Sequence, residues 1–109
     1  MGVLQVDPIA TLEQIRNPLS KIPFKISRIT RIIAYIERAV ADILAQDLQN
    51  AAEKIRLIEY ELKTTKPMYF TPIQPYLLDY CQVLRRAFRE YYGIYIPQRV
   101  NPFRLMSRP

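Results

Sequence analysis

Arginine is the residue type through which this sequence offers most chemistry, and the arginines are unevenly distributed along the chain. The 109 residues carry a formal net charge of +6, and residues 66–109 hold seven basic residues against two acidic ones. A planar guanidinium donates two parallel hydrogen bonds to a phosphate, and phosphate contacts release counterions from nucleic acid. This concentration of positive charge therefore indicates a surface for a nucleic-acid backbone.

Helical spacing separates these arginines from the apolar positions. At about 100° per residue, Arg85, Arg86 and Arg89 fall opposite the apolar positions of residues 73–91, so that one face packs and the other is basic. We predict backbone contacts to DNA or RNA, without strong sequence selectivity, through Arg28, Arg31, Arg38, Arg85, Arg86, Arg89, Arg99 and Arg104. The alternative is an arginine-rich face that is only solvated, or that pairs with acids of a partner subunit.

The composition gives little support to a catalytic function. The chain has no histidine, one cysteine and two glycines, which excludes histidine as a general base, the usual zinc sets and glycine-rich phosphate loops. Glu53, Glu59 and Glu61 alternate with lysine and arginine, as on a solvated helix face. Cys81 lies in a helical pattern and is expected to be a half-buried structural thiol. We therefore predict that the protein is not an enzyme and uses no cofactor and no metal.

A second class of function follows from apolar residues outside the main stripes. Burial by a protein partner or by a second copy of the chain would explain them. The candidate interface residues are Leu57, Tyr60, Leu78, Phe103, Leu105 and Met106. The preferred prediction is a non-catalytic accessory or structural subunit on nucleic acid, and the alternative is a protein–protein adaptor or assembly subunit.

Apolar periodicity predicts the helices that carry these residues. Asp7 and Pro8 read as a helix start, and the pattern stops at Asn17–Pro18. Residues 26–64 keep helical spacing throughout, either as one long helix or as a hairpin with a turn near residues 46–50. In the hairpin, Asn50 and Glu53 would form a capping box.

The last helix is predicted from Pro72 to Tyr92, with Thr71 as its cap, Gln74 at the capping-box position and Gly93 as the left-handed residue that ends it. The predicted fold class is all-α, a small bundle of three to four helices with residues 1–96 as the helical domain and 97–109 as an extended Pro/Arg-rich tail. No apolar run approaches the ~20 residues that cross a bilayer, and no secretory signal is apparent. We expect an intracellular, cytoplasmic protein without membrane insertion.

Overall fold

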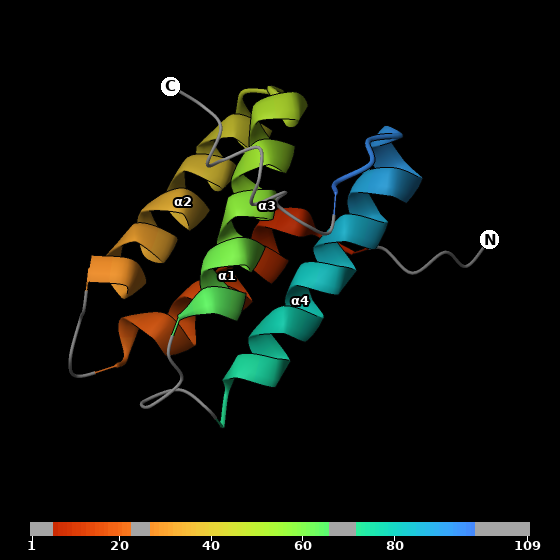
Figure 1. Cartoon of the computed structure of the whole chain (residues 1–109). Helices are drawn as coiled ribbons and strands as arrows, with labels where there is room; N and C mark the ends of the chain where they lie inside the picture. The colour runs from red at the N-terminus through yellow and green to blue at the C-terminus, as the bar shows by residue number, and fades with distance from the viewer. Residues whose placement is uncertain (1–5, 23–26, 66–71, 98–109) are drawn as a thin grey trace, which may run out of the picture.

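The computed structural model describes residues 6–22, 27–65 and 72–97, and these residues form a small all-α bundle (Figure 1). No β-strand occurs among them. The elements are α1 (Pro8–Ser20), α2 (Ser27–Leu44), α3 (Leu48–Thr64), α4 (Gln74–Ala87) and a π-helical turn, η1 (Phe88–Tyr92). The predicted fold class is confirmed, while the tail beyond residue 97 lies outside the described residues.

The first helix begins where the sequence predicts and ends later. The Asp7 carboxylate accepts a hydrogen bond from the amide of Ile9 at 3.0 Å, as an N-cap does. The predicted stop at Asn17–Pro18 is wrong, because α1 continues through Pro18 for two more residues. Pro18 has no amide hydrogen to donate to the carbonyl of Gln14, so the helix loses one bond there, and Leu19 beside it is fully buried. Packing of Leu19 therefore outweighs the proline.

Residues 27–64 form a hairpin and not one long helix. Gln46 adopts a left-handed conformation with φ of 63°, and the amide of Asp47 donates to the carbonyl of Asp42 at 2.8 Å. Asp47 precedes α3, and Asn50 donates to its carboxylate at 2.7 Å, so the predicted capping box at Asn50 does not start the helix. The turn brings α2 and α3 side by side in antiparallel directions (Figure 1).

The start of α4 also differs from the prediction. The helix begins at Gln74, two residues after Pro72, and Thr71 lies outside the described residues. The predicted capping-box bond between Gln74 and Thr71 therefore lies outside the described residues, while the Gln74 side chain donates to the carbonyl of Leu62 at 2.7 Å. This bond satisfies a carbonyl in the last turn of α3, where no intrahelical donor exists. Gln74 therefore joins the end of one helix to the start of the next.

The core draws on all four helices and on the segment after η1. Burying one Leu, Ile or Phe side chain contributes about 1.5–3 kcal/mol of transfer free energy. Fully buried are Leu12, Ile15, Leu19, Ile32, Ile36, Ile58, Leu62, Leu84, Phe88 and Ile96. In the described part of the chain, no helix has the length and apolar character needed to cross a membrane.

Cys81, on α4, is more buried than the sequence predicts, with 1% of its surface exposed. Burial raises the pKa of the thiol from 9.0 to about 12, and the negative charge of Glu59 adds to this increase, against the opposing charges of Arg85 and Lys63. The thiol is therefore neutral in the folded protein and is a poor nucleophile at physiological pH.

This pKa predicts a loss of stability at alkaline pH. In the unfolded chain the thiol ionises from about pH 9, while the folded state keeps its proton up to about pH 12, so the free energy of unfolding falls as pH rises through this window. The slope from Cys81 approaches about 1.4 kcal/mol per pH unit. Urea denaturation at pH 8–11 should show a shallower decline for Cys81→Ala than for the wild type; parallel declines would contradict the assignment.

Candidate functional site

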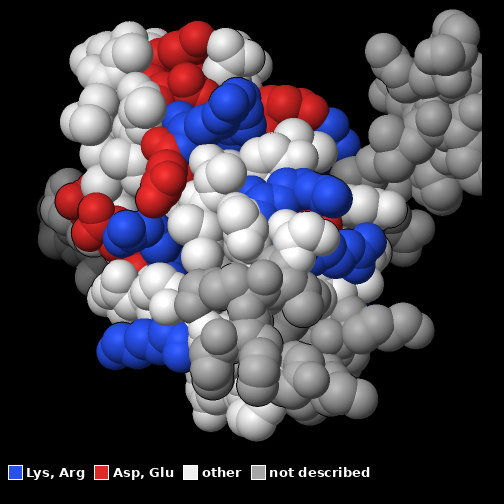
Figure 2. Space-filling view, turned by 90° about the vertical axis from the view of Figure 1, so that its left-hand side faces the viewer, with Lys and Arg blue, Asp and Glu red and all other residues white. Residues whose placement is uncertain are grey.

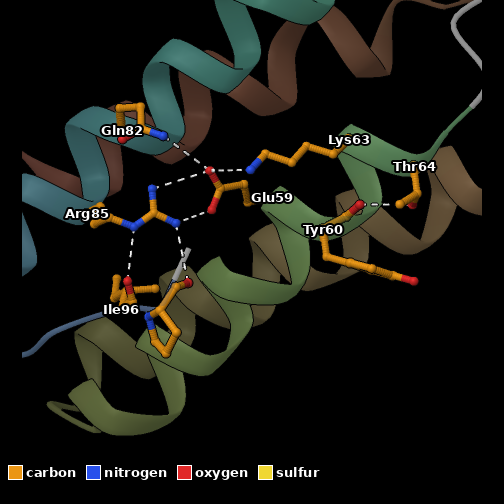
Figure 3. A network of polar contacts seen from close by, with 8 residues as sticks. Glu59, Tyr60, Lys63, Thr64, Gln82, Arg85 and Ile96 are labelled. Carbon is orange, nitrogen blue, oxygen red and sulfur yellow. Dashed lines mark hydrogen bonds and ion pairs between the residues drawn. The ribbon is translucent and has the colours of Figure 1, made fainter. Parts of the chain in front are cut away.

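Arg85 does not lie on an exposed basic face, so that part of the prediction is wrong. Its side chain is 10% exposed and pairs with Glu59 of α3, whose side chain is 2% exposed. The guanidinium is bidentate, with Nη1 donating to Oε2 at 3.3 Å and Nη2 donating to Oε1 (Figure 3). A single-helix pattern cannot reveal an acid on the neighbouring helix that draws an arginine inward. The Arg85 guanidinium is therefore already paired inside the protein.

The same guanidinium also holds the chain that follows η1. Arg85 Nε donates to the carbonyl of Ile96 at 3.0 Å, and Nη2 donates to the carbonyl of Pro97 at 3.4 Å (Figure 3). Gln82 Nε2 donates to Glu59 Oε2 at 3.3 Å, and Lys63 Nζ lies 3.7 Å from that oxygen. A buried charge is costly unless it is paired and hydrogen-bonded, and both conditions are met here. The pair thus links α3, α4 and the segment ending at residue 97.

Arg28 and Arg31 of α2 are also engaged within the fold. Arg28 Nε lies 3.5 Å from Glu61 Oε1, and Arg31 Nη1 donates to Glu61 Oε2 at 3.2 Å. Glu61 is buried, as is Glu59, so the prediction that these two acids lie on a solvated face is wrong. On the side of the molecule where α2 lies, basic and acidic side chains are interleaved (Figure 2). The described residues on this side do not form a continuous basic surface.

Arg86 and Arg89 remain exposed beside the buried pair. Neither makes an ion pair or side-chain hydrogen bond with another residue in the described part of the chain, and the same is true of Arg38 on α2. Arg86 on α4 and Arg89 on η1 line a pocket of about 330 Å³ together with Gln82, Arg85 and Tyr95. The pocket combines two exposed guanidinium groups, an amide and a phenol, a set suited to binding an anion.

Tyr95 reaches this pocket because the chain reverses at Gly93. Gly93 ends the helix with φ of 69°, as predicted, and its amide donates to the carbonyl of Arg89 at 3.1 Å. The amide of Ile94 donates to the carbonyl of Phe88 at 3.1 Å, a bond that spans the whole π-helical turn and closes the end of the helix. Beyond it Ile96 is fully buried, while the Tyr95 side chain is exposed. Tyr95 is not among the site residues predicted from the sequence; its position between Ile94 and Ile96 is the signal that could have identified it.

Three of the six predicted interface residues lie in the described part of the chain, and all three are half-buried. Leu57 and Tyr60 on α3 are half-buried, and Leu78 on α4 is half-buried against the core. The Tyr60 side chain points away from the Glu59 network (Figure 3). Burial of these three side chains by another chain stays a prediction. Arg99, Phe103, Arg104, Leu105 and Met106 lie outside the described residues.

No protein-family model, no curated protein and no solved structure matches this chain. Within residues 6–22, 27–65 and 72–97, no cluster of three or more His, Cys, Asp or Glu side chains is placed to hold a metal ion. The function is therefore inferred from the chemistry of the pocket.

The buried pair predicts a large difference between two glutamates of α3. Glu59→Ala leaves Arg85 buried without its counter-charge and should lower the free energy of unfolding by about 3–5 kcal/mol. Glu53→Ala is the matched control, because Glu53 is half exposed and pairs with Arg56 on the same helix. Its loss should stay within about 1 kcal/mol. Chemical denaturation measures both values, and equal losses would show that the buried pair contributes no more than a surface pair.

Proposed function

We propose that this protein is a non-catalytic accessory subunit that contacts a nucleic-acid backbone through the pocket of Arg86 and Arg89. The observation that supports the proposal is that these two arginines are exposed, lie on one pocket and have no side-chain partner among the described residues. Arg85 contributes the pocket wall and fixes its shape, and its guanidinium is not among the phosphate ligands. Arg28 and Arg31 are left out of the proposed surface because Glu61 engages both.

Two guanidinium groups give a modest, salt-dependent affinity. For duplex DNA the logarithm of the binding constant falls with the logarithm of salt concentration by about 0.9 for each phosphate contacted. Nonspecific binding of this kind has dissociation constants of about 10⁻⁴ to 10⁻⁶ M. In this proposal Arg99 and Arg104, which follow the last described residue in the sequence, add further contacts. Such an affinity suits an accessory protein that acts beside other nucleic-acid contacts.

Reversing the charge of the pocket tests this function. Arg86→Glu with Arg89→Glu should weaken binding to a labelled duplex and to a single strand by at least roughly tenfold at low salt, and should reduce the salt slope by about 2. The matched control is Lys21→Glu with Arg38→Glu, which changes the net charge equally at exposed residues; this proposal leaves Arg38 out of the interface because Arg38 does not line the pocket. Fluorescence anisotropy titrations over a range of salt concentrations provide the measurement. Equal loss in both double variants, or no loss in either, would refute a pocket-centred interface.

A second candidate is an assembly subunit whose C-terminal segment docks on another copy of the chain. A groove of about 370 Å³ between α1 and α4 favours this candidate, because it is lined by Pro18, Leu77, Tyr80 and the 67% exposed Tyr76. Residues 98–109 of a second copy carry Phe103, Leu105 and Met106, and apolar side chains fit such a groove.

Deleting residues 98–109 tests the second candidate. The truncated chain should lose self-association in sedimentation equilibrium, because the proposed donor segment is gone while the groove remains. Tyr76→Ala in the full chain should weaken the same association by removing an aromatic wall of the groove. A wild-type chain that is monomeric at high concentration, or a truncated chain that associates equally well, would rule this candidate out.

A further inference from the structure

Tyr95 is an aromatic side chain that the fold holds in solvent beside the two exposed arginines. Its exposed fraction is 67%, although large aromatic side chains usually bury most of their surface. It lines the same pocket as Gln82, Arg86 and Arg89. A flat apolar face next to cationic groups is the combination with which proteins bind the bases and phosphates of single strands.

The backbone around Tyr95 is fixed on both sides. Before it, Gly93 in its left-handed conformation and the bond from the Ile94 amide to the Phe88 carbonyl set the direction of the chain. After it, the Ile96 side chain is fully buried and its carbonyl accepts a hydrogen bond from Arg85 Nε. Ordering a flexible aromatic side chain on binding costs affinity, and a fixed backbone reduces that cost. The backbone that carries Tyr95 is therefore already in place before a ligand binds.

We propose that this pocket binds single-stranded nucleic acid, with one base stacked on the ring of Tyr95 and the adjoining phosphates held by Arg86 and Arg89. This inference rests on the proposed function and narrows its substrate class. A duplex keeps its bases stacked and paired inside, so only a single strand offers a free base face to the ring. The pocket of about 330 Å³ lies at the small end of the range for ligand sites, which starts at roughly 300 Å³. This size suits one nucleotide and not a longer segment.

Tyr76 provides a matched control within the chain. It has the same exposed fraction as Tyr95, 67%, and it lies in the first turn of α4. Its groove, however, contains Lys21 and no arginine. If exposure of an aromatic ring alone were sufficient for binding, both tyrosines would respond to a single strand. The proposal requires that only Tyr95 does.

The absence of tryptophan in the sequence allows a direct measurement of stacking. Tyr95→Trp and Tyr76→Trp each introduce a single tryptophan, and both are titrated with an unstructured oligothymidine and with a duplex of the same length at low salt. We expect saturable quenching of the tryptophan in Tyr95→Trp by the single strand, and little quenching by the duplex. The tryptophan of Tyr76→Trp should keep its fluorescence with both ligands.

Affinity measurements separate this inference from the proposed function. Tyr95→Ala should weaken single-strand binding about tenfold, leave duplex binding and the salt slope unchanged, and Tyr95→Phe should restore the affinity. Thermal unfolding followed by circular dichroism checks that Tyr95→Ala folds normally. If charge reversal at Arg86 and Arg89 weakens binding while Tyr95→Ala and the tryptophan quenching show no effect, stacking is refuted and the backbone interface stands. If the arginine variants also bind normally, both proposals fail.

Discussion

The buried pair of Glu59 and Arg85 is the interaction on which the arrangement of this protein's surface depends. Its two members come from α3 and α4, and Arg85 additionally binds the carbonyls of Ile96 and Pro97. Removing two charges from water is costly, and geometry of this quality is needed to compensate for it. The pair therefore fixes the spacing of the two helices and the path of the chain after η1 together. Tyr95 and the pocket are positioned by that path.

Two buried glutamates on opposite sides of α3 link this helix to both α2 and α4. Glu59 and Glu61 are two residues apart, which on an α-helix separates them by about 200°. Glu59 accordingly meets Arg85 on α4, and Glu61 meets Arg28 and Arg31 on α2. Both neighbouring helices supply arginine to a buried carboxylate of the helix between them. The central helix thus determines which arginines of α2 and α4 pair with a buried carboxylate.

The sequence predicted the parts of the structure that depend on local chemistry. Asp7 as a cap, the helical stretches and Gly93 as a helix end all follow from neighbouring residues, and each is present. The extension of α1 through Pro18 could not be predicted, because the packing of Leu19 decides it. The sequence also left undecided whether residues 26–64 form one helix or a hairpin. The residue that turns the chain in a left-handed conformation is Gln46, and a glycine there would have indicated the turn.

The candidate site was predictable only in part, because charge pairing between helices is a tertiary property. A helical pattern places Arg85, Arg86 and Arg89 on the same polar face. In the structure, however, Arg85 forms a buried pair with Glu59 of another helix, while Arg86 and Arg89 stay exposed. The same separation distinguishes Arg28 and Arg31 from Arg38. A helical projection contains neither the partner nor its burial, so it overestimated the basic surface.

Because several arginines are paired within the fold, the surface has fewer charges with which to attract a phosphate. A net charge of +6 suggests strong electrostatic attraction, but charges already paired with Glu59 and Glu61 release few counterions when a phosphate approaches. An interface with two exposed guanidinium groups would lose most of its electrostatic affinity at physiological salt. Stacking on an aromatic ring is far less sensitive to salt than an ion pair. For this pocket, a neutral contact at Tyr95 is therefore the component that would keep binding effective once the electrostatic part is screened.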